Sequence, residues 1–391
     1  MIMKFMYALV FLVVISTFSN CKSDIKNTSE QEAVVVIDSV IFSFSFVGCN
    51  RVNRGDAVDS VPSTANKYAL QRIFKEVTEL EEQPDLFFFL GDLVLAESTL
   101  PNLDTQLNAW LKLYESDSIS KTKMEMVAVP GNHEMLYSKQ VLKKKKKNKK
   151  KKKLSKKDST WKEFPLLGST DIWLNHMKSY MPSDRDQAPS SDTLDNRMTF
   201  SFTRYNVGFV VMNTDSYNPP TTEHPYGVEG MVPTQWIIDK VNEYKAESSI
   251  DHIFVLGHKP YYVNGEGETG HDGLPAGPVL WPALQNARVN SMLSAHKHDY
   301  QRWQPINDSL GGGTYQVIAG NGGSEGKAPF FGYSTISIMK SGKVNLNSVG
   351  FCIGNPYTEA VPQNATLPRD EVTLTWELNP DLFYQPYNRC N

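Results

Sequence analysis

Short runs made almost entirely of apolar residues constrain the fold of this 391-residue chain more than any other feature. The run at 86–90 is unbroken, and those at 124–129 and 252–256 each include one polar residue, Glu125 and His252. Runs of this length are typical of strands buried in the middle of a sheet, with helices on both faces. The stretches 63–80 and 107–114 carry apolar residues at helical spacing, so the chain alternates strands with helices. This order predicts an α/β fold with parallel strands, because parallel neighbours need a crossover connection.

The remaining elements are predicted from alternation and turn residues. We expect a first strand region at 34–47, and the helix at 63–80 to be capped by Ser63. Further along, the pattern predicts a hairpin, a helix and several more strands: 199–203 with 208–213, 233–244, 252–256, 291–295, 314–319 and 333–339. From 351 to 391 the pattern weakens, and we interpret this part as a C-terminal extension packed on the domain.

The first residues resemble an export signal. Lys4 precedes an apolar run at 9–15, which is too short to span a bilayer, and small and polar residues then lead to Cys21. We predict a lipoprotein-type signal peptide over 1–20 and a polar tether over 21–33. The protein would be exported to the cell envelope, periplasmic or at the surface, and anchored to a membrane by lipid on Cys21. The alternative is an ordinary secretory signal.

The formal net charge of −3 hides one strongly basic strip. Lysines crowd the stretch 143–157, so the rest of the chain is acidic. Nearly pure lysine without interleaved aromatic residues indicates a solvated, low-complexity loop rather than a nucleic-acid site. We expect no nucleic-acid partner; contact of Lys143–Lys153 with an anionic surface is the alternative role.

Polar side chains follow the predicted strands at the point where each strand ends. They are Asp92, Asn132 with His133, His258, and His296 with His298. In an open α/β sheet the carboxyl ends of the strands converge on one edge, where ligands bind. Imidazole and carboxylate groups together suit Fe, Zn or Mn. The sequence therefore predicts a site for one or two such ions. Two such ions can clamp an in-line displacement at phosphorus, with a metal-bound hydroxide as the nucleophile, so no serine or cysteine nucleophile is needed.

These motifs resemble the calcineurin-like metallophosphoesterase superfamily: Gly91-Asp92, Gly131-Asn132-His133-Glu134, His258 and His296-x-His298. Within it, the segments 200–215, 294–302 and 318–323 are most similar to the purple acid phosphatase branch. The resemblance implies a four-layer α/β/β/α sandwich with two mixed sheets, formed by residues 34–350.

The resemblance also implies roles for the polar residues. Asp92 would bridge two ions, with Asn132, His258 and His296 completing one metal position and His298 serving the other. His133 would lie near the leaving-group oxygen and protonate it or stabilise its charge. A simpler interpretation is that His133 only positions Asn132.

The first motif departs from the family pattern. Cys49 stands where the family has an aspartate, and Arg51 where it has a histidine; Leu95 replaces the tyrosine ligand of purple acid phosphatases. A phosphatase type resembling alkaline phosphatase D has a cysteine at this position. The resemblance therefore implies that Cys49 is a metal ligand. The alternative is that Cys49 is only a small buried thiol at the end of the strand. Arg51 would bind a phosphate oxygen; the alternative is that it forms a surface ion pair.

We therefore expect metal-dependent hydrolysis of phosphate esters, with a phosphorylated small molecule as substrate and acid-phosphatase-like action on monoesters. Two alternatives remain at this stage. One is a phosphodiesterase of the same superfamily, and the other is a degenerate, non-enzymatic member that binds polyanions.

Overall fold

The computed structural model describes residues 38–96, 99–142, 159–192, 194–218, 228–268, 273–324, 330–351, 365–377 and 383–386. The predicted signal peptide (1–20), tether (21–33) and lysine-rich loop (143–157) lie outside the described residues, as does much of the C-terminal extension. Two large sheets and the helices beside them lie within the described ranges.

The first of the two large sheets is built around the apolar run at 86–90. Its strands, in spatial order, are β19 (Leu367–Thr373), β18 (Val344–Phe351), β17 (Phe331–Met339), β1 (Val40–Val47), β2 (Leu86–Leu90) and β3 (Glu125–Val129). The strands β1, β2 and β3 are parallel, as the sequence predicts, and β17 joins β1 antiparallel. The sheet is therefore mixed.

The second sheet contains the other predicted buried strand, β11. Its order is β20 (Phe383–Tyr384), β15 (Tyr300–Trp303), β16 (Tyr315–Ala319), β14 (Ser291–Ser294), β11 (His252–Gly257), β8 (Val207–Met212), β7 (Phe200–Arg204) and β6 (Asp186–Gln187). The four strands β8, β11, β14 and β16 are parallel, and the predicted hairpin of β7 with β8 is present.

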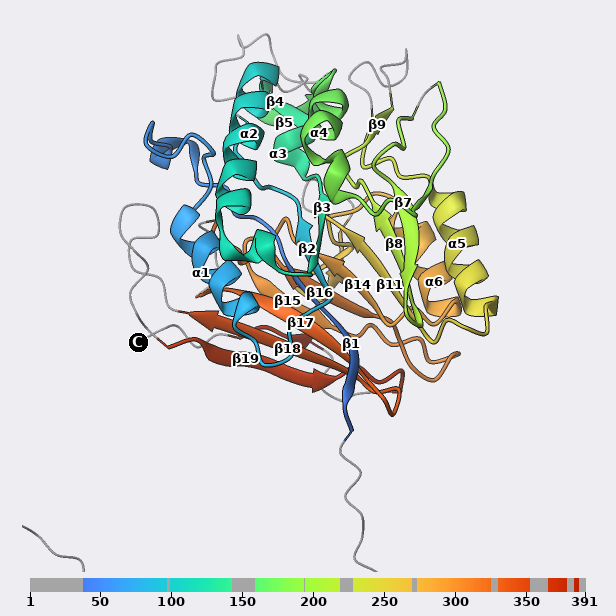
Figure 1. Ribbon diagram of the computed structural model, residues 1–391. Coiled ribbons are helices and arrows are strands. Elements are labelled where there is room, and N and C mark those ends of the chain that lie inside the picture. Colours follow the sequence, from blue (N-terminus) through green and yellow to red (C-terminus); the bar gives the residue numbers. More distant parts are fainter. Residues whose placement is uncertain are drawn as a thin grey trace, which may run out of the picture. The chain divides into compact units, whose positions relative to one another are not determined.

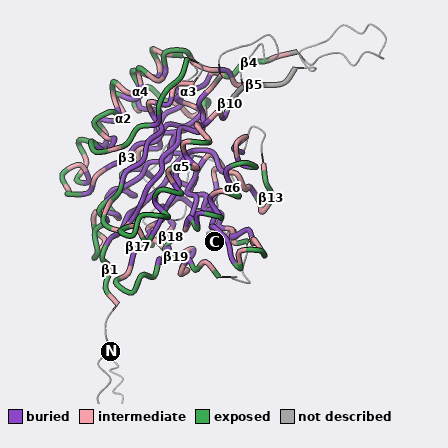
Figure 2. Tube along the Cα trace, turned by 90° about the vertical axis from the view of Figure 1, so that its right-hand side faces the viewer, coloured by how far each residue is buried: buried purple, intermediate pink, exposed green. Residues whose placement is uncertain are grey.

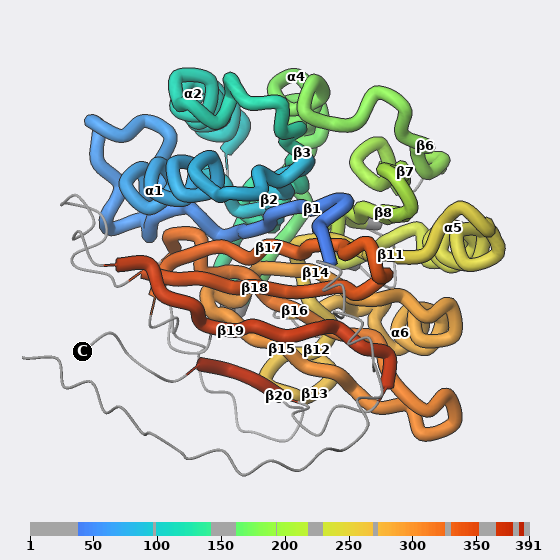
Figure 3. The backbone as a smooth tube through the Cα atoms, turned by 60° about the horizontal axis from the view of Figure 1, so that its bottom comes forward, coloured from blue at the N-terminus to red at the C-terminus, as the bar shows by residue number. Residues whose placement is uncertain are grey.

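Helices cover the outer face of each sheet (Figures 1 and 3). They are α1 (Lys67–Thr78), α2 (Leu100–Ser116) and α4 (Ser169–Met177) beside the first sheet, and α5 (Thr234–Ala246) and α6 (Gly277–Asn286) beside the second. This arrangement confirms the four-layer α/β/β/α sandwich. Short elements fill the connections: α3 (Asn132–Met135), β4 (Leu136–Leu142), β5 (Ser159–Pro165), β9 (Tyr217–Asn218), β10 (Val228–Glu229), β12 (Tyr262–Val263) and β13 (Glu266–Gly267).

Aromatic side chains fill the space between the two sheets. The Phe44 ring of β1 lies 5.2 Å from Phe209 and 5.1 Å from Phe254 of the second sheet, measured between ring centroids. On β2, Phe88 faces this core while Phe87 and Phe89 pack beneath the helices, so the strand is buried on both faces. The strands form the buried centre of the fold (Figure 2).

The predicted start of the first helix is wrong. The helix begins at Lys67, and the side chain of Asn66 caps it by accepting a hydrogen bond from the backbone N–H of Ala69. Ser63 lies outside the helix because the segment before Asn66 pairs with another part of the chain: Ala65 forms an isolated β-bridge with Arg51. Local sequence favoured an earlier cap, and a contact with a distant segment decided otherwise.

Two described parts of the C-terminal extension join the sheets. The strand β19 pairs antiparallel with β18, and β20 pairs antiparallel with β15. Among the described residues, the helices are too short or too polar to cross a bilayer.

Candidate metal centre

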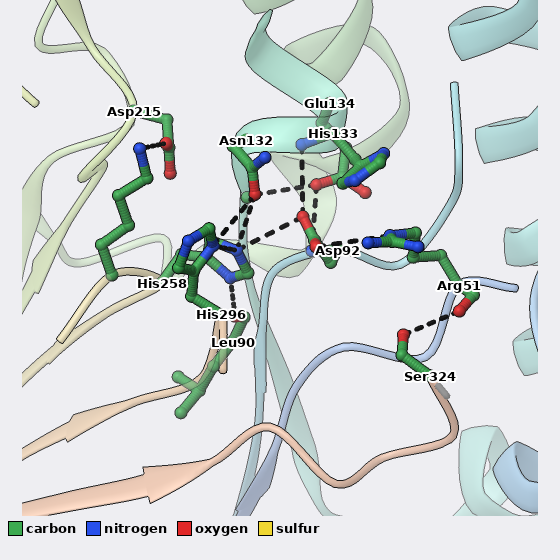
Figure 4. A network of polar contacts seen from close by, with 12 residues as sticks. Arg51, Leu90, Asp92, Asn132, His133, Glu134, Asp215, His258, His296 and Ser324 are labelled. Carbon is green, nitrogen blue, oxygen red and sulfur yellow. Dashed lines mark hydrogen bonds and ion pairs between the residues drawn. The ribbon is translucent and has the colours of Figure 1, made fainter. Parts of the chain in front are cut away.

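The predicted site residues come from loops at the carboxyl ends of strands in both sheets. Cys49 and Arg51 follow β1, Asp92 follows β2, and Asn132 begins α3 just after β3. From the second sheet, His258 follows β11 and His296 follows β14. Figure 4 shows Asp92, Asn132, His258 and His296 pointing toward one another.

His258 presents a defined nitrogen to this cluster. Its Nδ1 lies 2.7 Å from the carbonyl oxygen of Leu90, and because a carbonyl only accepts, Nδ1 carries the proton. In the neutral ring Nε2 is then an unprotonated acceptor, directed at the Asn132 Oδ1 at 3.1 Å. A backbone carbonyl that fixes the tautomer is the usual support of a metal-binding histidine.

Asn132 is oriented in a similar way. Its Nδ2 donates a hydrogen bond of 2.9 Å to Oε1 of Glu163, on β5. The amide oxygen therefore faces the cluster, 3.2 Å from Nδ1 of His296.

The four converging atoms suit a bound cation. Asp92 Oδ1, Asn132 Oδ1, His258 Nε2 and His296 Nδ1 are joined by separations of 3.1–3.3 Å. When the His258 ring is neutral, its Nε2, the Asn132 Oδ1 and the Asp92 Oδ1 all present lone pairs to one another, which is unfavourable unless a positive charge lies between them. Ligands about 2.1 Å from a central ion stand about 3.0–3.4 Å apart, which matches these separations. The residues present therefore fit a metal ion.

Asp92 carries the negative charge of the centre. Burial alone would raise its pKa, but the nearby His258, His133 and Arg51 hold the pKa well below its usual range. Its Oδ1 accepts from the backbone N–H of His133 at 3.2 Å, and its Oδ2 lies 3.6 Å from Nε of Arg51. One carboxylate oxygen thus faces His258 and the other faces the guanidinium (Figure 4).

Cys49 lies in the same cluster. Its sulfur and ligand atoms of Asp92 and His258 lie within 4.8 Å of one another. Burial raises the pKa of the Cys49 thiol well above its usual value, and Asp92 adds to this while Arg51 opposes it. A thiolate forms here only against a compensating cation.

The remaining two predicted residues, His133 and His298, lie close to cluster residues in the sequence. His298 is half-buried on the loop after β14, two residues beyond His296. His133 donates from Nδ1 to the carbonyl of Leu95 at 3.1 Å, which leaves Nε2 for another partner. Burial lowers the pKa of His133, although Asp92 opposes this shift.

Three of these residues have a left-handed backbone. The φ angles are 59° at Cys49, 56° at Asp92 and 62° at His296. Such conformations cost about 1–3 kcal/mol each for residues other than glycine, and they cluster at functional sites. Gly131 is required by the same close packing, because a Cβ there would lie 2.4 Å from Asp92 Oδ1.

Glu134, to which the sequence assigned no role, ties the loops together. Its fully buried carboxylate accepts hydrogen bonds from the backbone N–H groups of Asp92, Val94 and Gly131, at 2.8–3.0 Å. Burial, with the nearby charge of Asp92, raises the pKa of Glu134 to about 8, and the three N–H donors limit the rise.

A second group that the sequence did not reveal surrounds Lys259. This lysine is fully buried, and its Nζ lies 3.2 Å from Oδ1 of the buried Asp215 and 4.0 Å from Oε2 of Glu163. The position of Lys259 directly after His258 was the only local signal for it. Nothing in the sequence near Glu163, which follows the lysine-rich loop, marks it.

Residues 63–300 match the sequence model of the family described as calcineurin-like phosphoesterase. This match covers more than half of the chain, and the chain belongs to the calcineurin-like phosphoesterase family. The superfamily expected from the motifs is thereby confirmed. A comparison with curated protein sequences finds no significant match.

Two solved structures are similar to this chain, and the first of them, PhoD, shows the same fold. PhoD is 12% identical, with a TM-score of 0.53, over 90% of this chain and 72% of that one. A purple acid phosphatase from seeds of yellow lupin, Lupinus luteus, is 15% identical, with a TM-score of 0.48, over 84% of this chain. The chain spans 54% of the length of the lupin enzyme.

Replacing the buried lysine tests the charge network. We expect Lys259→Met to lower the free energy of unfolding by about 3–5 kcal/mol, because it leaves the buried charge of Asp215 without its partner. Adding Asp215→Asn should recover part of the loss. Urea unfolding of the metal-free protein measures both.

The matched control is Lys75→Met, which removes a surface lysine paired with Glu79 at 3.9 Å. A surface pair contributes at most about 1 kcal/mol. If Lys259→Met unfolds at the same urea concentration as this control, the buried network does not stabilise the fold.

Proposed function

We propose that this chain is a metal-dependent hydrolase of phosphate esters that acts chiefly on monoesters, in the manner of acid phosphatases. The observation that carries the proposal is the convergence of Asp92, Asn132, His258 and His296 at strand ends, in a calcineurin-like phosphoesterase. A metal ion bound by them would supply Lewis-acid polarisation of the phosphoryl group and activation of water.

The chain's own residues would divide the remaining work. Arg51 would bind a phosphate oxygen through its guanidinium, a role supported by its proximity to Asp92 at the edge of the cluster. His133 would face the leaving-group oxygen with Nε2, because Nδ1 is engaged by Leu95. In its protonated form it donates to that oxygen as the ester bond breaks.

Loss of a proposed ligand should abolish most activity. Para-nitrophenyl phosphate hydrolysis with Mn²⁺, Zn²⁺ or Fe²⁺ is the assay. We expect His296→Ala to lower kcat/KM by about 100-fold or more, since metal polarisation contributes several kcal/mol to the transition state. The control is His176→Ala, which should retain full activity. His176 lies on the outer helix α4 and pairs with Asp104 of α2.

The substrate preference is tested in the same assay. Faster turnover of bis(para-nitrophenyl) phosphate than of the monoester would favour the phosphodiesterase alternative. Folded protein that hydrolyses neither ester with any of these ions would overturn the proposal.

The two metal positions should differ in affinity. We propose one tight position at Asp92, Asn132, His258 and His296, and a weaker one formed by Cys49, Asp92 and His298. The weaker position is disfavoured by the positive charge of Arg51, 3.6 Å from the carboxylate that both would share.

Metal analysis by mass spectrometry tests this difference. Dialysed protein should retain close to one ion per chain, and Arg51→Ala should raise the occupancy of the second position at a given Mn²⁺ concentration. Cys49→Ser should lower it. Unchanged occupancy in both variants would contradict the proposed second position, and less than one ion per folded wild-type chain would favour a non-enzymatic polyanion-binding member.

We also propose export and anchoring by lipid at Cys21, on the sequence pattern of residues 1–21. Cells that express the chain should incorporate radiolabelled palmitate into it and retain it in the membrane fraction. Cys21→Ser should lose the label, whereas the control Cys49→Ser should keep it. An unlabelled mature protein that begins elsewhere would support an ordinary secretory signal.

A further inference from the structure

Glu163 reaches the metal centre from an unexpected direction. It lies on β5, the second strand of the hairpin β4–β5, where it pairs with Ser138. This hairpin begins directly after α3 and brackets the lysine-rich loop in the sequence. The strand that follows the lysine-rich loop in the sequence therefore places a carboxylate at the centre.

The side chain of Glu163 accepts a hydrogen bond at one oxygen and has a buried ammonium group near the other. Oε1 accepts from Nδ2 of Asn132 at 2.9 Å, and Oε2 lies 4.0 Å from the buried Nζ of Lys259. Lys259 is itself fixed by Asp215, at 3.2 Å. The glutamate thus connects a buried ion pair to the Asn132 amide.

The backbone of Glu163 is held as well. The hydroxyl of Tyr217 donates a hydrogen bond of 2.6 Å to its carbonyl oxygen. The side chain of Glu163 is 12% exposed, so water competes little with these contacts. The carboxylate therefore has a fixed position relative to Asn132.

We infer that Glu163 is a positioning residue that orients the Asn132 amide, so that its oxygen rather than its nitrogen faces the metal position. An amide side chain can rotate to present either atom, and only the oxygen is a metal ligand. A carboxylate accepts hydrogen bonds and donates none, so it selects the orientation in which Nδ2 faces away from the centre. The buried ammonium group of Lys259, paired with Asp215, lies 4.0 Å from the second oxygen of Glu163 and favours the charged carboxylate there. This inference rests on the proposed metal position.

Mn²⁺ titration of the purified full-length chain, by calorimetry and electron paramagnetic resonance, tests the inference. We expect Glu163→Ala to weaken Mn²⁺ binding by about 10–100-fold, the usual effect of losing a partner that orients a ligand. Glu163→Gln retains an oxygen that can accept from Asn132, and it should bind within about threefold of wild type. The control is Glu82→Ala, which removes an exposed carboxylate and should change nothing.

A double-variant cycle separates orientation from simple charge attraction. In an Asn132→Asp background both side-chain oxygens are acceptors, so no orientation is needed. There, Glu163→Ala should leave Mn²⁺ affinity unchanged or increase it, because the Glu163 carboxylate would repel the new carboxylate at position 132. Equal weakening in both backgrounds would show that Glu163 acts only through its charge, and would overturn the inference.

The outcomes also separate this inference from the proposed function. Wild-type protein that binds no Mn²⁺ overturns the metal position, and the orienting role of Glu163 with it. Wild-type protein that binds Mn²⁺ with an affinity unchanged in Glu163→Ala overturns the orienting role alone. Urea unfolding of each metal-free variant confirms that a loss of binding is not a loss of fold.

Discussion

The buried carboxylate of Glu134 is the interaction on which the geometry of the centre depends. By accepting from the backbone N–H groups of Asp92, Val94 and Gly131, it joins the loops that follow β2 and β3. These loops approach so closely that only glycine fits at position 131. Without the Glu134 carboxylate, the backbone N–H groups of the two loops would be buried and unpaired, and the loops would lose the hydrogen bonds that join them.

The same crowding explains the backbone conformations around the centre. Cys49, Asp92 and His296 each turn sharply after a strand with a positive φ. The two sheets are held rigid by the aromatic core between them, and a rigid framework can maintain such strained residues. The strain directs side chains from both sheets into one volume. A site formed by short, strained turns on rigid strands keeps its groups in fixed relative positions.

The altered first motif changes the balance of charge rather than the fold. Arg51 places a positive charge beside the carboxylate of Asp92, at the position where the family motif has a histidine. On the opposite side, Glu163, Lys259 and Asp215 form a buried network with the amide of Asn132. One side of the centre is therefore supported by several buried contacts, and the other by an arginine and a thiol. This asymmetry is the physical basis for proposing unequal metal positions.

The sequence alone determined the buried parallel strands and the polar residues that follow them, since both are local patterns: short apolar runs, then Asp92, Asn132, His258 and His296. It also indicated the two mixed sheets, through family motifs. Only the tertiary structure decided the cap at Asn66, the roles of Glu134 and Glu163, and the addition of β19 and β20 to the sheets. Each of these depends on contacts between segments that are distant in the chain or separated by a loop. Local propensity carries no information about such contacts, because their partners are brought together only when the sheets and helices pack.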